Sequence, residues 1–112
     1  MKSTFAEPIE RLPRADIFLA GCTAHLLQGP GQQVLFMEFS EDVDLPEHVH
    51  AGQAGFVLEG RIDLVIGGRP LTFTKGDRYY IPPGVRHSGR IHAGYADITY
   101  FDQPDRYSIK KP

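Results

Sequence analysis

The amino-acid sequence predicts an all-β domain, either a sandwich or a barrel, built from short strands. Apolar or alternating segments of strand length follow one another along most of the 112-residue chain. Glycine and proline mark turns between these segments, as in QGPGQ, GGRP and KGDR. No stretch shows convincing spacing for an amphipathic helix. Together these three observations favour a small all-β fold.

The expected strands of the first half lie on either side of two turns. The first strand is IFLA at 17–20, and it precedes a turn at Gly21. TAHLL at 23–27 comes next and ends at the turn QGPGQ. QQVLFMEFS at 32–40 follows that turn and supplies the third expected strand.

The second half of the chain has the clearer strand signals. GFVLEG at 55–60 and RIDLVIGG at 61–68 are joined by the turn EGR. Within the latter, Ile62, Leu64 and Ile66 recur at every second position, which is the period of a half-buried strand. The remaining expected strands are separated by KGDR, PPG and HAGY and lie at 70–74, 78–82, 86–93 and 95–101.

The length of the chain predicts a single domain with one core. Residues 1–16 contain Pro8 and Pro13 and are predicted to form an N-terminal arm, either loose or draped over a neighbour. Residues 17–112 are predicted to form the β domain. The sequence shows no internal repeat and no low-complexity segment.

Composition narrows the choice of partners and compartment. The formal net charge is −2, so nothing favours a phosphate backbone or an anionic membrane as partner. No apolar stretch approaches the length that spans a bilayer. Cys22 is the only cysteine and cannot close an internal disulfide, which fits a reducing compartment. We therefore expect a cytoplasmic protein without nucleic-acid or membrane partners.

The tetrapeptide LAGC, which ends at Cys22, offers an alternative as the cleavage pattern of a lipoprotein. A signal peptide needs an uninterrupted apolar segment upstream of the cysteine. Charged residues and a proline interrupt that approach here, namely Glu10, Arg11, Pro13, Arg14 and Asp16. A strand at 17–20 with a turn at Gly21 is therefore the preferred interpretation.

Candidate metal ligands appear around residue 50. In a strand, residues two apart share a face, so His48 and His50 would project together and present ring nitrogens to one cation. Gln53 lies just beyond Gly52, where the chain can turn and direct an amide oxygen at the same point. His87 follows the PPG turn and would begin the next strand. These residues predict a metal site assembled from distant parts of the chain.

At these residues the chain resembles the cupins, a family of small double-stranded jelly-roll barrels. The second cupin motif reads G-x5-P-x-G-x2-H-x3-N. Its first four fixed positions are matched at every interval by Gly76, Pro82, Gly84 and His87. Only the terminal asparagine is missing, because Ile91 stands there.

The first cupin motif, G-x5-H-x-H-x3,4-E-x6-G, is matched less completely. His48, His50 and Gly60 fit, while Asp42 replaces the opening glycine. Counting back from Gly60 places Gln53 at the glutamate position, behind a shortened loop. Glutamine at this position is a known variation within the family.

The resemblance covers about residues 32–101 and implies a jelly-roll barrel with a metal inside its mouth. It also implies a homodimer formed by packing of sheets. Three imidazoles and one oxygen donor suit Fe(II), Mn(II), Ni(II), Co(II), Cu(II) or Zn(II). Because His48, His50, Gln53 and His87 are all neutral as ligands, the charge of a divalent ion stays uncompensated, and an anionic ligand should bind well.

Other polar residues have weaker claims on the site. His25 and His92 are expected to be core or rim residues, and Glu59 to be exposed or structural. Several residues are candidates to line the mouth, although alternating aromatic residues more often serve in packing: Tyr79, Tyr80, Tyr95, Tyr100, Arg78 and Arg90. Ser88 is expected to point away from His87, and Cys22 has no partner, so no nucleophile is identified.

Three function classes remain open. The first is a metal-dependent enzyme acting on a small anionic molecule, of the dioxygenase, isomerase or lyase type. The second is a non-catalytic module that binds or senses a small molecule through the same metal site. The third is a metal-free scaffold. Since fold alone does not assign function, an open coordination position facing a polar pocket would favour the enzyme.

Overall fold

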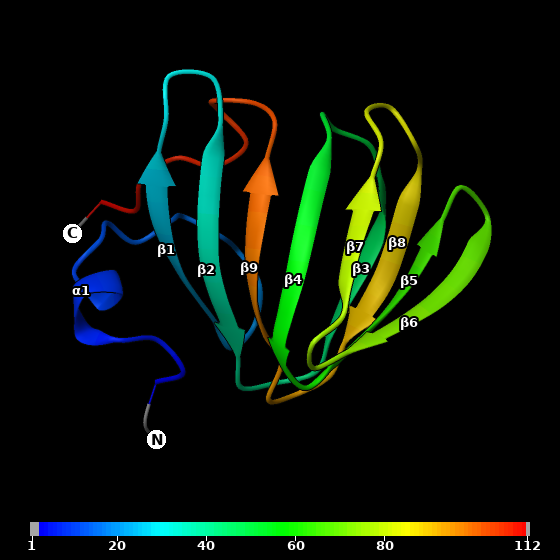
Figure 1. The fold of residues 1–112 in the computed structure, drawn as a ribbon, viewed down its shortest axis with the longest axis horizontal. Coiled ribbons are helices and arrows are strands. Elements are labelled where there is room, and N and C mark those ends of the chain that lie inside the picture. Colours follow the sequence, from blue (N-terminus) through cyan, green and yellow to red (C-terminus); the bar gives the residue numbers. More distant parts are fainter. Residues whose placement is uncertain (1–2, 112) are drawn as a thin grey trace.

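The computed structural model describes residues 3–111 and has the predicted all-β jelly-roll architecture. Figure 1 shows its two antiparallel sheets, with α1 on the side of β1. The elements are α1 (Glu7–Glu10), β1 (Cys22–Gln28), β2 (Gln33–Phe39), β3 (Val43–His48), β4 (Gln53–Glu59), β5 (Arg61–Ile66), β6 (Arg69–Thr74), β7 (Arg78–Ile81), β8 (His87–Ile91) and β9 (Ala96–Phe101). Among the described residues, no helix is long and apolar enough to cross a membrane.

The order of the strands places distant segments next to each other. The five-stranded sheet has the order β1-β2-β9-β4-β7, and the four-stranded sheet has the order β3-β8-β5-β6. β9, the last strand, therefore lies between β2 and β4 in the middle of its sheet. The inward faces of the two sheets together form one core, as in other sandwiches.

Alternation along the strands decides which residues enter this core. In β2 every second residue is buried, from Gln33 to Phe39. In β5, Ile62 and Leu64 are buried while Arg61 is exposed, so the predicted period of two is confirmed. The turn glycines lie where the chain reverses, and Gly84 in the PPG turn has a positive φ of 74°.

The prediction of a strand at 17–20 is wrong. The chain is irregular there, and β1 begins only at Cys22, after the turn at Gly21. Ile17 and Leu19 pack against the core, whereas Phe18 is 90% exposed. The apolar residues of this segment produce the sequence pattern of a strand. The segment is nevertheless not paired with a neighbouring strand.

The sequence did not predict strand β3. This strand forms one edge of the four-stranded sheet and pairs only with β8. Asp44, Pro46 and Glu47 are exposed, and this polar composition hides the strand from an apolar pattern. Proline and charge are typical of edge strands, where one side of the backbone needs no partner.

The predicted N-terminal arm packs on the barrel of its own chain. The ring of Phe5 is buried and meets Phe36 edge to face, with centroids 5.7 Å apart. Ser3 donates a hydrogen bond to the carboxylate of Glu38 at 2.7 Å. Farther along, Arg14 forms an isolated β-bridge with His25. The arm therefore covers part of the outer face of β1 and β2.

Candidate metal centre

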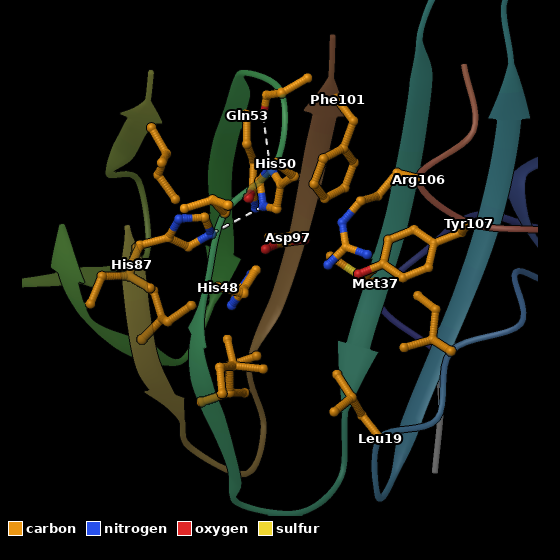
Figure 2. Close-up of a pocket in the computed structure, with 18 of the residues that line it drawn as sticks. Leu19, Met37, His48, His50, Gln53, His87, Asp97, Phe101, Arg106 and Tyr107 are labelled. Atoms are coloured by element: carbon orange, nitrogen blue, oxygen red, sulfur yellow. Dashed lines mark hydrogen bonds between the residues drawn. The ribbon is translucent and has the colours of Figure 1, made fainter. Parts of the chain in front are cut away.

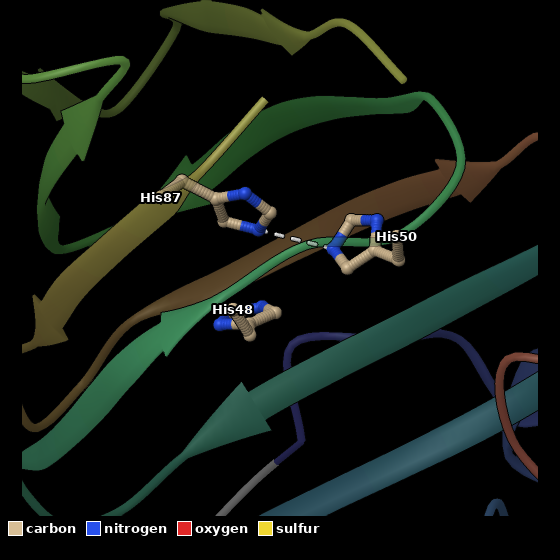
Figure 3. A group of neighbouring side chains, drawn as sticks. All are labelled: His48, His50 and His87. Atoms are coloured by element: carbon tan, nitrogen blue, oxygen red, sulfur yellow. Dashed lines mark hydrogen bonds between the residues drawn. The ribbon is translucent and has the colours of Figure 1, made fainter. Parts of the chain in front are cut away.

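Two strand ends and one loop bring three histidines together (Figure 3). His48 is the last residue of β3 and His87 is the first residue of β8, and the two are directly paired across the four-stranded sheet. His50 lies beyond the end of β3, in the loop that leads to β4. The expectation that one strand carries both His48 and His50 is therefore wrong, although the loop still turns both rings to the same point.

The geometry of the three rings suits a single ion. One nitrogen from each of His48, His50 and His87 lies within 4.8 Å of the others. The centroid of the His87 ring is 4.1 Å from that of His48 and 4.6 Å from that of His50. Imidazole nitrogens converging in this way can hold a divalent transition metal.

Backbone carbonyls determine which nitrogen of each ring carries the proton. Nδ1 of His48 lies 2.7 Å from the oxygen of Pro46, and Nδ1 of His50 lies 2.6 Å from the oxygen of Ala51. Nδ1 of His87 makes the corresponding contact with a carbonyl at 3.0 Å. Because a carbonyl oxygen only accepts, each Nδ1 must donate, and each neutral ring keeps its lone pair on Nε2.

The donor set therefore fits a metal ion. Nε2 of His50 lies 3.0 Å from Nε2 of His87. The lone pairs of these two nitrogens repel each other unless both nitrogens bind the same cation. Burial lowers the pKa of His50 to about 4, with the positive charge of Arg106 contributing in the same direction. Burial likewise lowers the pKa of His87. Both rings are thus in the neutral form that binds metal.

The histidines open onto a cavity of about 640 Å³ between the two sheets. Gln53, the first residue of β4, reaches the cavity from the five-stranded sheet. Figure 2 shows the guanidinium of Arg106 across the cavity from the histidines. Apolar side chains such as Leu19 and Met37 line much of the remaining wall.

Arg106 is held in place by aromatic rings, and none of the described residues forms a salt bridge with it. Its guanidinium carbon lies 4.5 Å from the centroid of the Tyr107 ring and 5.8 Å from that of Phe101. Its Nε is buried and finds no hydrogen-bond partner in the part of the chain that the structure describes. A buried donor of this kind is costly unless a ligand takes it up.

Comparison with known proteins gives the family of this chain. The family model described as "Cupin domain" matches residues 35–100, which is more than half of the sequence. The chain belongs to the cupin family. The match confirms the resemblance predicted over residues 32–101. No curated protein matches the sequence.

Solved structures agree with this cupin fold. An RmlC-like cupin from Shewanella frigidimarina is 24% identical with a TM-score of 0.74, and the match covers 94% of each chain. KdgF from Halomonas sp. is 17% identical with a TM-score of 0.71, covering 95% of this chain and 96% of KdgF. Oxalate decarboxylase of Bacillus subtilis, which has Mn(II) centres, is 17% identical with a TM-score of 0.68. That match covers 87% of this cupin but only 29% of the decarboxylase.

Of the residues expected to line the mouth of the cupin barrel, only Tyr79 does so. Tyr80 and Tyr100 are exposed, at 60% and 38%, and Tyr95 is fully buried. The guanidinium of Arg90 pairs on the surface with Asp42 and Asp44, and Arg78 is exposed. Strand parity separates these residues, because neighbours in a strand point to opposite faces.

The remaining expectations concern residues outside the metal centre. His25 is buried and its Nδ1 contacts the carbonyl of Leu12 at 3.0 Å. His92 pairs with Asp63 at 2.7 Å, away from the cavity. Glu59 pairs with a surface lysine. The expectations that these three are core, rim or surface residues are confirmed.

Sequence reasoning missed the C-terminal wall of this cupin cavity. Gln103, Asp105, Arg106 and Tyr107 line it, although they follow the last predicted strand. The segment folds back because Tyr107 is tied to Gln33, whose Oε1 accepts from the Tyr107 backbone at 3.0 Å. The sequence signal that could have indicated this wall is the pair of neighbours Arg106 and Tyr107, which follows the last barrel strand.

A buried carboxyl group was missed as well. Asp97 is 1% exposed and accepts hydrogen bonds from Tyr95, at 2.5 Å, and from Thr99, at 2.9 Å. Burial raises the pKa of Asp97 to about 7, although both hydrogen bonds act in the opposite direction. Asp97 therefore changes charge near neutral pH inside the barrel.

Proposed function

We propose that this cupin binds a divalent transition metal and uses it to act on a small anionic molecule, as a dioxygenase, isomerase or lyase. The observation that carries the proposal is the arrangement in one cavity of three imidazoles with converging Nε2 atoms and an arginine for which residues 3–111 supply no acidic partner. The cationic guanidinium of Arg106 and the three metal-binding imidazoles thus lie around one cavity of about 640 Å³, which is the size of a small-molecule site.

In this proposal His48, His50 and His87 bind the ion through Nε2, and Gln53 completes the set through its amide oxygen. Fe, Mn, Ni, Co, Cu and Zn all suit such a donor set. The ion supplies Lewis-acid polarisation of a bound oxygen atom, or activation of dioxygen beside a chelated substrate. An ion held by these four residues would bind substrate at any coordination position that the protein leaves open.

Arg106 provides the second half of substrate binding. Its planar guanidinium can hold a carboxylate through two parallel hydrogen bonds, while Tyr107 and Phe101 keep the plane oriented. Because all four proposed ligands are neutral, the metal attracts the same anion. The Bacillus subtilis oxalate decarboxylase of similar fold combines Mn(II) with the small dianion oxalate, which supports this pairing.

The experiment measures binding of small mono- and dicarboxylates to metal-loaded protein by calorimetry. We expect Arg106→Gln to weaken carboxylate binding tenfold or more while leaving metal content unchanged, because Arg106 does not bind the ion. Loading the protein with iron and following oxygen uptake, then assaying the same acids for turnover, tests the reaction class. Unaltered carboxylate affinity in the variant would contradict the proposal.

A second candidate is a non-catalytic module that binds the same ligand through the same metal. Burial raises the pKa of Tyr79 and of Tyr107, so neither phenol lining the cavity acts as a base near neutral pH. The loss of two candidate bases favours the module, whereas Asp97, which also lines the cavity and has a pKa of about 7, favours the enzyme. Carboxylate binding with no turnover and no oxygen uptake, whichever of the six metals is loaded, would establish the module instead.

We also propose that the cupin forms a homodimer through the outer face of its five-stranded sheet. Val34, Tyr100, Ala54 and Tyr80 form one row across four strands of that face. Phe56 lies in the next row and is 45% exposed. The exposed apolar rows would be covered by a second copy, since a two-fold dimer needs only one patch that matches itself.

The dimer is tested by light scattering. Tyr100→Glu is expected to give a monomer, because it places a charge at the centre of the row. Phe18→Ser is the matched control, since Phe18 is 90% exposed but lies at the cavity. A monomeric mass for the unmodified protein would contradict the proposal. Cytoplasmic location remains a prediction from the single cysteine.

A further inference from the structure

The peptide group that joins His50 to Ala51 is hydrogen-bonded at both of its ends. The His50 carbonyl accepts at 3.1 Å from the backbone N–H of Gly84, in the turn before β8. The N–H of Ala51 donates to Oε1 of Gln103 at 3.2 Å. Ala51 also provides the carbonyl that accepts from Nδ1 of His50 at 2.6 Å. His50 lies outside the strands, so these contacts hold its ring in place of a sheet ladder.

The side-chain amide of Gln103 has only one satisfactory orientation. A backbone N–H can only donate, so Gln103 must present Oε1 to Ala51. Its Nε2 then donates to Oδ1 of Asp105 at 3.1 Å. The reversed amide would place two donors together at Ala51 and two acceptors together at Asp105. Asp105 therefore fixes the amide, and a chain of hydrogen bonds leads from Asp105 to His50.

The contact with Gln103 also decides where the charge of Asp105 is placed. Asp105 precedes Arg106 in the sequence, and both residues line the cavity. An acid that pairs with a guanidinium competes with a substrate carboxylate for it. Here the carboxylate of Asp105 is bonded to Gln103, and none of the salt bridges among residues 3–111 includes Arg106. The positive charge of Arg106 is thus left for an anion in the cavity.

The metal half and the anion half of the site lie on either side of one aromatic ring. The centroid of the Phe101 ring is 5.4 Å from that of His50 and 5.8 Å from the guanidinium carbon of Arg106 (Figure 2). Directly after Phe101, the backbone N–H of Asp102 donates to the carbonyl of Gly52 at 2.8 Å, in the histidine loop. The segment that follows β9 is therefore in contact with both halves.

We propose that Gln103 is a positioning residue for both halves of the site. Its Oε1 holds the N–H of Ala51 so that Nε2 of His50 faces the metal. Its Nε2 holds Asp105 so that Arg106 stays free for a carboxylate. The inference rests on the proposed function, because that function gives His50 a metal and Arg106 an anion to bind.

The test measures Co(II) affinity by calorimetry, and then acetate affinity of the Co(II)-saturated protein. Gln103→Ala removes both contacts. Gln32→Ala is the matched control, because Oε1 of Gln32 also accepts a backbone N–H, from Gly31 at 2.8 Å, but Gln32 does not line the cavity. Visible absorption of bound Co(II) reports the arrangement of the histidine ligands, which a loss of global stability would not change.

We expect Gln103→Ala to shift the Co(II) spectrum and to weaken Co(II) binding about tenfold, the scale of lost partners behind metal ligands. Acetate affinity should fall about fivefold, since the released carboxylate of Asp105 can pair with Arg106.

Gln103→Glu combined with Asp105→Asn exchanges the acid and the amide without changing the net charge. The new carboxylate can still accept from Ala51, and the new amide can donate to that carboxylate. This pair of substitutions should therefore restore both affinities and the spectrum.

Asp105→Ala is a second break at an exposed residue, so the chain is tested even if Gln103→Ala folds poorly. Loss of the contact that fixes the amide should weaken Co(II) binding about threefold, the scale of one hydrogen bond. Acetate affinity should not fall, because the competing acid beside Arg106 is removed. Asp102→Ala is the control, since it removes the same charge from a neighbouring exposed position.

The failures are distinguishable. Co(II) affinity, spectrum or acetate affinity that is no different in Gln103→Ala from Gln32→Ala would overturn the positioning role and leave metal binding by the histidines in place. A loss that the charge-conserving pair does not reverse would overturn it as well. Absence of Co(II) binding by the unmodified protein, or of acetate binding to its Co(II)-saturated form, would overturn the proposed function, and this inference with it.

Discussion

The histidine cluster and the buried hydroxyl network of Asp97, Tyr95 and Thr99 both place polar side chains inside the barrel, but different parts of the fold hold them. His48, His50 and His87 lie at strand ends or in a loop. Tyr95, by contrast, has no exposed surface. Each histidine donates from Nδ1 to a backbone carbonyl, which leaves the Nε2 lone pair free to bind an ion. In the network, by contrast, the hydroxyls of Tyr95 and Thr99 donate to Asp97.

This difference suggests a division of labour. A site that must take up an ion needs free lone pairs and an opening, and loops provide both at little cost to the core. A network that must hold one orientation needs rigid strands and complete hydrogen bonding. Gln53 belongs to the first kind of site, because it reaches the cavity, where its Nε2 contacts the hydroxyl of Tyr79.

The largest expected effect breaks the histidine cluster alone. His48→Ala combined with His50→Ala should abolish stoichiometric metal binding, since one imidazole and one amide do not hold the ion. The fold should survive, because neither side chain is fully buried. Elemental analysis of protein prepared with transition metals measures the first effect, and circular dichroism the second. Full metal content in the double variant would disprove the site.

The next effect alters the packing of Tyr79 within the five-stranded sheet. Gly55→Ala places a methyl group 2.2 Å from the Tyr79 ring, and overpacking of this kind destabilises by about 1–3 kcal/mol. Gly31→Ala is the matched control, because a Cβ atom there meets nothing within 4 Å. Urea unfolding of both variants gives the difference. Equal stability of the two would show that the ring moves aside without cost.

Titration of the network should be visible in the pH dependence of stability. The pKa of Asp97 is raised from 3.8 to about 7, so the unfolded chain loses this proton first as pH rises. The contribution of Asp97 to the free energy of unfolding is then full below pH 4 and falls between about pH 4 and 7. Its neighbours Tyr95, Tyr79 and Cys22 stay protonated in this window, since burial raises the pKa of each.

His50 and His87 act in the opposite direction, because their lowered pKa values make stability fall as pH drops below 6.5. The measurement is therefore the difference between the unmodified protein and Asp97→Asn, from urea unfolding at pH 4 to 8. The unmodified protein should lose stability relative to the variant as pH rises. A pH-independent difference would mean that Asp97 has an ordinary pKa.

The smallest effect concerns Gln53, the fourth candidate ligand. Gln53→Glu adds one negative charge beside the ion, and we expect it to lower carboxylate affinity about fivefold without unfolding the barrel. Calorimetry on metal-loaded protein measures the change, with Glu59→Gln as a control outside the cavity. Unaltered anion affinity would count against the charge argument.

Much of the fold could be predicted from local patterns. Alternation identified β5, and glycine-rich turns located the boundaries around β7 and β8, with His87 at the start of β8 as expected. The segment 17–20 and strand β3 were misjudged for a common reason. Apolar residues indicate burial rather than pairing, and an edge strand such as β3 can be paired while remaining polar.

For the candidate site, the sequence indicated the histidines and Gln53 because motif spacing is a property of the chain itself. Its only indication of Arg106 was the neighbouring Tyr107, because Arg106 enters the cavity only after the C-terminal segment folds back onto Gln33. Asp97 appeared to be an ordinary polar residue of the last strand. Its burial depends on the place of β9 between β2 and β4.

The sequence by itself determined the fold class, the family and the four candidate ligands, since these depend on residue types at short, regular spacings. Only the tertiary structure decided which nitrogen of each histidine is free, where Arg106 lies, and how deeply Asp97 is buried. Those features arise from contacts between residues that are distant in the chain. Hydrogen bonds, burial and charge act over a few ångströms in space, and sequence spacing does not record that distance.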